Sequence, residues 1–303
     1  MRDATLQVIA QANDIIATYA RQGYDLTLRQ LYYQFVSRDL IANKQTEYKR
    51  LGDIVSKGRR AGLIDWSAIV DRTRNLQSLS TWDSPSDIVN AVATQFRYDW
   101  WANQPVYCEV WFEKDALMGV FERPANRYRV PFFSCRGYTS DSEIWGASQR
   151  LVKQRKAGKR CVILHFGDHD PSGIDMTRDI GDRLRLFRAR VDVRRLALNF
   201  DQIDQYGPPP NPAKETDSRF AEYQALHGDE SWELDALEPT VLGALVRDEV
   251  DALVDKTAWD AERLREAEAR AELAEISANY DDIVRDYPAA EVGLADLDDE
   301  EDE

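Results

Sequence analysis

Two stretches of the sequence decide its fold, Val106-Tyr-Cys-Glu-Val-Trp-Phe-Glu-Lys-Asp-Ala-Leu117 and Cys161-Val-Ile-Leu-His-Phe-Gly-Asp-His-Asp-Pro-Ser-Gly173. Each is an apolar run of strand length that ends in carboxylates. Helical patterns lie between and after them, and this alternation is typical of a mostly parallel sheet covered by helices. Because ligands of such sheets gather outside the carboxyl ends of the strands, Glu113, Asp168 and Asp170 are candidate site residues.

The α/β pattern extends over residues 105–212. It predicts strands over 106–112, 129–134, 160–166 and 191–198, and helices over 115–122, 141–157 and 172–188. The segment Tyr206-Gly-Pro-Pro-Pro-Asn-Pro212 ends this domain, because its prolines favour an extended, non-helical connection.

The carboxylates at the predicted sheet edge suit a divalent cation. Mg²⁺ binds through one or two carboxylate oxygens and leaves its other positions to water and substrate phosphate. A helix that starts at Pro171 could also hold a phosphate oxygen at its N-terminus. The alternative is that Asp168 and Asp170 serve only as turn and cap residues and that Glu113 is a surface glutamate. The spacing favours a metal site formed by Glu113, Asp168 and Asp170.

The first 80 residues predict a small helical domain. A helical stripe covers residues 4–21, and a second helix begins after Thr27, where Gln30 completes a capping box. A third, amphipathic helix follows, and its polar positions are basic. The candidates for contact with DNA are Lys49, Arg50, Lys57, Arg59 and Arg60 on this helix, and Arg136 in a loop near the strand ends.

Residues 63–70 predict a short strand, followed by Arg72 and Arg74. Three helices, the last one basic, and a β wing are the outline of a winged helix-turn-helix, whose third helix enters the major groove. A helical domain with a solvated basic face would give the same pattern. Both interpretations of residues 1–80 remain open on the pattern alone.

The formal charge of −15 is unevenly distributed. Residues 228–303 hold 26 acidic and 6 basic side chains, so residues 1–227 carry a net charge of about +5. Residues 81–104 are predicted to be a linker, residues 213–290 a helical extension and residues 291–303 an acidic disordered tail. The basic part of the chain is therefore compatible with a nucleic-acid partner.

Neither a membrane span nor a signal peptide is indicated, so a cytoplasmic, nucleoid-associated location is expected. The three cysteines, Cys108, Cys135 and Cys161, lie in apolar segments and are expected to be reduced core thiols.

Tyr33 is a candidate nucleophile. The helical pattern places it on a polar face, one turn after Arg29. A phenol with a pKa near 10 needs a nearby cation or base to react at neutral pH, and Arg29 could supply the charge. On the pattern alone, an ordinary structural tyrosine is the more common interpretation.

Together, Thr27-Leu-Arg-Gln-Leu-Tyr-Tyr33, Glu113-Lys-Asp-Ala and Gly167-Asp-His-Asp-Pro-Ser-Gly173 resemble motifs of the topoisomerase VI A subunit and its relative, the meiotic double-strand-break protein. Proteins of that family join a winged helix to a Toprim domain. The resemblance covers roughly residues 20–215. It departs from the family at Gln30, where an acidic residue is usual, and at Ser134 or Cys135, one of which stands where a glycine is expected.

The resemblance implies a type IIB topoisomerase-like centre. Tyr33 would be the nucleophile, assisted by Arg29 and Glu113, and Mg²⁺ would be held by Glu113 and Asp168 with Asp170 in support. It further implies a homodimer on double-stranded DNA and a separate ATPase subunit, because the chain has no G-x-x-x-x-G-K-[ST] loop. Two alternatives stay open: a Toprim nuclease that uses metal-activated water, and a catalytically degenerate DNA-binding regulator.

Overall fold

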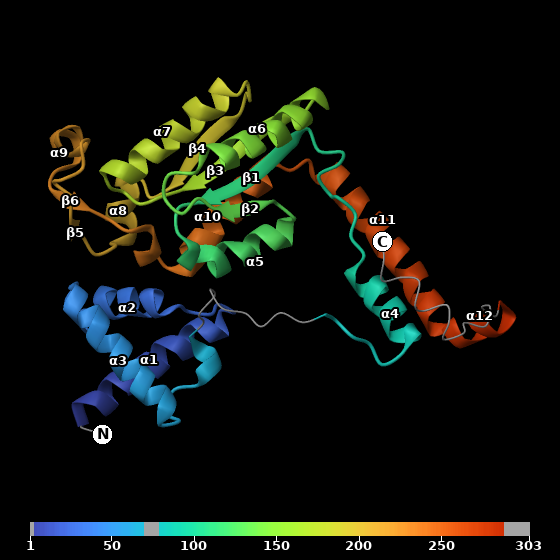
Figure 1. Cartoon of the computed structure of the whole chain (residues 1–303), viewed down its shortest axis with the longest axis horizontal. Helices are drawn as coiled ribbons and strands as arrows, with labels where there is room; N and C mark the ends of the chain where they lie inside the picture. Colours follow the sequence, from blue (N-terminus) through green and yellow to red (C-terminus); the bar gives the residue numbers. More distant parts are fainter. Residues whose placement is uncertain (1–2, 70–78, 288–303) are drawn as a thin grey trace, which may run out of the picture. The chain divides into compact units, whose positions relative to one another are not determined.

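The computed structural model describes residues 3–69 and 79–287, which form an α/β fold around a four-stranded parallel sheet (Figure 1). The chain divides into two compact units. The first contains the described residues of 1–75 and 104–255, and the second those of 76–103 and 256–303. Arg72, Arg74 and the predicted tail 291–303 lie outside the described residues.

The sheet of the first unit has the strand order β2-β1-β3-β4, with every pair parallel. The strands are β1 (Val106–Phe112), β2 (Phe132–Ser134), β3 (Arg160–Phe166) and β4 (Asp192–Ala197). The strands predicted over 106–112 and 160–166 are confirmed residue for residue. Phe112 pairs with Phe166 at the ends of β1 and β3, so the residues that follow both strands emerge at one edge.

Helices cover both faces of the sheet (Figure 1). On one face lie α6 (Asp141–Lys156) and α7 (Pro171–Leu186), and on the other α5 (Met118–Tyr128) and α10 (Pro239–Leu253). Fully buried Ile144 and Leu151 of α6 pack in one core cluster with Trp111 of β1 and Ile163 of β3. The shorter elements are η2 (Asp115–Leu117), α8 (Phe200–Tyr206), β5 (Asn211–Pro212), α9 (Phe220–His227), β6 (Glu230–Ser231) and η3 (Leu234–Ala236).

The N-terminal part of this unit consists of α1 (Asp3–Arg21), α2 (Leu28–Ser37) and α3 (Gln45–Arg60). The predicted capping box of α2 is confirmed: the Gln30 amide donates to Thr27 Oγ1 at 3.3 Å, and the Thr27 amide donates to Gln30 Oε1 at 2.9 Å. The three helices share a core that includes Ile15, Leu31 and Leu51. The three helices predicted from the apolar stripes are thus present.

The strand predicted over residues 63–70 is wrong for residues 63–69. These form the 3₁₀ turn η1 (Trp66–Ala68) and a single parallel bridge between Ile69 and Leu26. Asp65 Oδ1 accepts hydrogen bonds from the Ser67 amide at 2.8 Å and from Ser67 Oγ at 2.7 Å. This local side-chain bonding favours a turn over a strand.

The second unit is helical and consists of α4 (Pro85–Gln95), α11 (Lys256–Ala278) and α12 (Tyr280–Asp286). The segment 81–104, predicted to be a linker, contains α4, which packs on α11. Glu266 of α11 is buried, and hydrogen bonds from the Tyr98 amide at 2.8 Å and from Trp100 Nε1 at 3.1 Å satisfy its carboxylate. Among the described helices, none is long and apolar enough to cross a membrane.

The two ends of the sheet-bearing segment are joined side by side. Gln104 Nε2 donates to the Asp255 carbonyl oxygen at 3.0 Å, and the Asp255 amide donates to Gln104 Oε1 at 2.8 Å. Gln104 is buried, so this amide pair satisfies both of its polar atoms. The first and last residues of the segment 104–255 are therefore neighbours in space.

Candidate metal centre and tyrosine pocket

The ends of β1 and β3 bring Glu113 and Asp168 together. The Glu113 amide donates to the Phe166 carbonyl oxygen at 2.9 Å, and the Asp168 amide donates to Glu113 Oε2 at 2.8 Å. Burial raises the pKa of Glu113, and the bond from the Asp168 amide opposes that rise. Burial likewise raises the pKa of Asp168 well above its usual range, against the effect of the nearby Lys114.

Asp168 also belongs to a cluster with Glu233 and Asp235, and one oxygen from each of the three carboxylates lies within 4.8 Å of the others. The segment that carries Glu233 and Asp235 reaches Asp168 because the backbones of His169 and Trp232 form an antiparallel bridge. In addition, the Leu234 amide donates to Asp168 Oδ1 at 2.7 Å. Three converging carboxylates are a donor set that a hard divalent cation accepts.

The ammonium group of Lys114 lies among these carboxylates. Its Nζ is 2.8 Å from Asp168 Oδ1 and 2.9 Å from Asp235 Oδ1, and it also contacts Glu233. Burial lowers the pKa of Lys114, but the three carboxylates outweigh burial and raise it. Lys114 therefore stays charged and provides the positive charge that a metal ion would bring.

Asp170 has a different role from Asp168. Its Oδ1 caps α7 by accepting hydrogen bonds from the Gly173 amide at 2.5 Å and from Ser172 Oγ at 3.0 Å. Among the described residues, the carboxylates that converge are Asp168, Glu233 and Asp235 rather than the predicted set Glu113, Asp168 and Asp170. The chain approaches closely at this cap, and position 173 needs a glycine because a Cβ there would lie 2.3 Å from the Asp168 carbonyl oxygen.

Arg195 supports this edge of the sheet from β4. Its guanidinium donates five hydrogen bonds, to Thr177 Oγ1 and to the carbonyl oxygens of Gly167, Asp168, Gly173 and Leu198, at 2.6–3.1 Å. Burial lowers the pKa of Arg195 to about 10, so it remains charged at neutral pH. Arg195 is not predicted from the sequence, although an arginine within a predicted strand is a signal for such a role.

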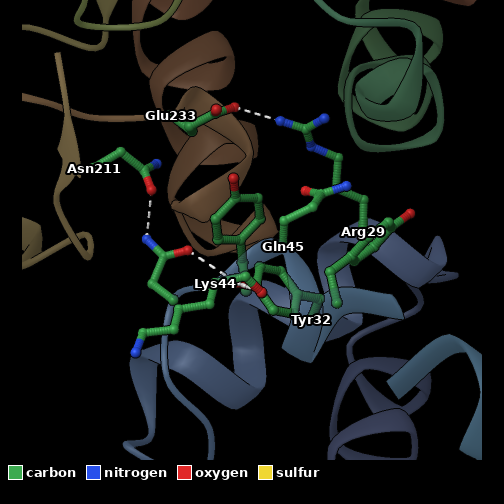
Figure 2. Close-up of a pocket in the computed structure, with 9 residues that line it drawn as sticks. Arg29, Tyr32, Lys44, Gln45, Asn211 and Glu233 are labelled. Atoms are coloured by element: carbon green, nitrogen blue, oxygen red, sulfur yellow. Dashed lines mark hydrogen bonds and ion pairs between the residues drawn. The ribbon is translucent and has the colours of Figure 1, made fainter. Parts of the chain in front are cut away.

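Tyr33 lines a pocket next to the carboxylate cluster. Figure 2 shows this pocket, with Arg29 and Glu233 labelled. The pocket has a volume of about 240 Å³. Glu233 and Arg29 face each other in it, joined by an ion pair of 2.6 Å, and Arg29 Nε lies 2.8 Å from Asp235 Oδ2. The other lining residues are Tyr32, Asn43, Lys44, Gln45, Tyr48 and Asn211.

The prediction that Tyr33 projects from a polar face is wrong. Tyr33 is only 5% exposed, because Ala236 and the segment before it cover α2 and join the core around Tyr33. Burial raises its pKa, and Asp235 and Glu233 raise it further, while Arg29 acts in the opposite direction. The phenol therefore holds its proton firmly in this arrangement.

The predicted DNA-contact residues fall into two groups. Lys49, Lys57 and Arg60 are exposed on α3, as is Arg50, which pairs with Glu47 at 2.6 Å. Arg59 instead packs on the Trp66 ring at 5.5 Å and donates to the Trp66 carbonyl oxygen at 3.0 Å, so it stabilises the turn after α3. Arg136 is exposed and pairs with Asp115 at 2.6 Å.

Comparisons with known proteins add nothing to these observations: no family model, curated protein or solved structure matches the chain.

Proposed function

We propose that this protein binds double-stranded DNA and cleaves it by attack of Tyr33 on a backbone phosphate, with Mg²⁺ as cofactor. The observation that carries the proposal is the position of Arg29 and Tyr33. They share a pocket with Glu233, a member of the carboxylate cluster at the carboxyl edge of a parallel sheet. The resemblance to the topoisomerase VI A subunit points to the same residues and to a winged-helix and Toprim architecture.

The residues divide the chemistry among themselves. The Tyr33 oxygen would form a bond to phosphorus while the bond from phosphorus to the 3′ oxygen breaks, which leaves a 5′-phosphotyrosyl link and a free 3′ hydroxyl. The phenol proton would leave to a base or water, and the 3′ oxygen would gain one. A bound divalent cation would supply charge stabilisation at the phosphate. Asp168 would hold it with Glu113, or with Glu233 and Asp235.

Arg29 and Lys114 would have to rearrange for this reaction. A DNA phosphate could replace Glu233 as the partner of Arg29, because guanidinium groups bind phosphate and carboxylate oxygens alike. The phosphate would bring a negative charge in place of Glu233, so this exchange alone would not lower the pKa of Tyr33, which burial raises most. Activation of the phenol in this proposal therefore requires the bound divalent cation or a rearrangement that exposes Tyr33.

The test is cleavage of supercoiled plasmid with Mg²⁺ or Mn²⁺, stopped with detergent and divided into samples with and without protease. We expect DNA covalently attached to protein, lost in Tyr33→Phe and retained in the control Tyr32→Phe. Asp168→Asn should also abolish cleavage. The assembly state and any stimulation by a separate ATPase subunit are measured with the same preparation, because the resemblance leads us to propose both a homodimer and such a subunit.

Hydrolysis by metal-activated water is a second candidate, which the burial and raised pKa of Tyr33 favour. Cleavage that survives Tyr33→Phe but not Asp168→Asn would establish hydrolysis and contradict the tyrosine mechanism. Salt-sensitive DNA binding with no cleavage under any condition would instead support the DNA-binding regulator.

A further inference from the structure

A second basic site lies on the first unit, in a hollow of about 250 Å³. Four of its five lining residues are cations. Arg155 and Lys156 belong to the last turn of α6, and Arg188 and Arg190 to the loop between α7 and β4. Val152 completes the lining, which contains no carboxylate.

The hollow is at the opposite edge of the sheet from the carboxylate cluster. The end of α6 leads into β3, and the loop after α7 leads into β4. Because β3 and β4 are parallel neighbours, both connections reach the sheet at its amino edge. β3 has 7 residues, so the two edges are separated by about 20 Å along the strand.

The four cations have no partners within the described residues, where none of their side chains forms an ion pair or a hydrogen bond. All four are exposed. The neighbouring arginines of α7 are different: Arg178 pairs with Asp175 and Asp182, and Arg185 pairs with Asp182. Favourable interaction with a helix C-terminus accounts for Arg155 and Lys156. It does not account for the convergence of two loop arginines on the same hollow.

We propose that this hollow binds the sugar-phosphate backbone of duplex DNA, as a contact additional to the candidate cleavage site. Unpaired like charges that converge on one hollow repel each other, and an anion with several phosphates removes that repulsion. Three of the four are arginines, whose planar donors match phosphate oxygens. A protein partner would need an apolar centre to its interface, and Val152 is the one apolar residue in the lining.

The test is the salt dependence of binding to a duplex of about 60 base pairs in EDTA, where no cleavage occurs. The double variant Arg155→Gln/Arg190→Gln is compared with Arg178→Gln/Arg185→Gln, which removes the same charge from paired arginines. Each lost phosphate contact reduces the slope of log K against log salt by about 0.9. We expect the first variant to lose about two units of slope and the control to keep the wild-type slope, with unchanged thermal unfolding in both.

That the ligand of this hollow is DNA rests on the proposed function, whereas binding there does not require cleavage. Equal slopes in the two variants would overturn it and leave the tyrosine mechanism untouched. Weakened binding of an acidic peptide that copies residues 296–303, with an unchanged duplex slope, would overturn it in favour of a protein ligand. The expected slope change in a protein that never cleaves plasmid would support this site and contradict the proposed cleavage.

Discussion

Lys114 lies among the three carboxylates of the cluster and neutralises part of their charge. The side chain of Asp235 is fully buried, and its pKa is lowered, because Lys114 and Arg29 outweigh the effect of burial. An isolated carboxylate would be very costly in such a place. The charge balance of the cluster is therefore maintained by residues of the chain itself, and a metal ion would compete with Lys114 for the same oxygens.

Substitution of Lys114 by methionine tests this competition. We expect Lys114→Met to lose about 3–5 kcal/mol of unfolding free energy, because buried carboxylates are left without their cation. Millimolar Mg²⁺ should then raise the melting temperature of the variant more than that of the wild type, since an ion that binds only the folded state stabilises it. Thermal unfolding with and without Mg²⁺ measures both effects, and Lys153→Met, an exposed lysine of α6, is the control. Equal Mg²⁺ shifts in variant and wild type would contradict a metal capacity at this cluster.

Two adjacent arginines of β4 allow a matched comparison. Arg195→Met removes five hydrogen bonds, among them those to the carbonyl oxygens of Asp168 and Leu198, together with a buried charge, so we expect a loss of about 3 kcal/mol or more. Arg194 is part-exposed and pairs with Asp192 and Glu249, so Arg194→Met should cost only about 0–1 kcal/mol. Urea unfolding of the two variants checks the difference. Similar losses would show that Arg195 is not the support that its hydrogen bonds suggest.

At the residue scale, the sequence predicts part of the candidate site. Glu113 and Asp168 follow recognisable strands, and the structure joins them by a hydrogen bond. Glu233 and Asp235 were not predicted, because they come after a proline-rich connection and reach Asp168 only through the bridge between His169 and Trp232. The same segment buries Tyr33, so a helical pattern could not reveal its environment. These are tertiary contacts, for which local periodicity contains no signal.

In α7, the close approach of Gly173 to the Asp168 carbonyl oxygen constrains the sequence of the first turn. Gly173→Ala would place a Cβ against the Asp168 backbone oxygen, which cannot retreat without moving the candidate site. We expect a loss of about 1–3 kcal/mol. Gly181→Ala in the same helix is the control, because its nearest neighbour, a Val193 methyl group, is 4.0 Å away, and it should gain up to about 1 kcal/mol from helix propensity. Chemical denaturation of both variants gives the result; a Gly173→Ala protein as stable as wild type would refute the close approach.

Elements were predicted well where periodicity and capping agree. The strands and helices from β1 to β4 alternate in the sequence as they do in the fold, and Thr27 and Gln30 fix the start of α2. The failure at residues 63–69 has a local cause, since Asp65 and Ser67 form a side-chain turn that competes with a strand. Patterns of apolar residues thus locate long helices and strands, whereas a hydrogen bond between two polar residues can determine whether a short segment forms a turn or a strand.

For the molecule as a whole, His165 predicts a dependence of stability on pH. It is fully buried, and burial lowers its pKa to about 3 from 6.5. Below pH 6.5 the unfolded chain takes up a proton that the folded protein does not, so stability decreases as the pH falls, by about 1.4 kcal/mol per pH unit from this group. Glu113 and Asp168, whose pKa values are raised, act in the opposite direction. The measurement is therefore the difference in unfolding free energy between wild type and His165→Asn from pH 7.5 to 4.5. A difference that does not shrink with acidification would contradict the assignment.

The pairing of Gln104 with Asp255 has a consequence for engineering and evolution. Since both ends of residues 104–255 meet in one amide pair, this segment has the form of a cassette with adjacent termini. Proteins tolerate insertion and permutation at such points. The segment could be closed on itself with a short linker while the order of its strands is preserved, provided that it stays paired with α1–α3, whose core includes its Ala236.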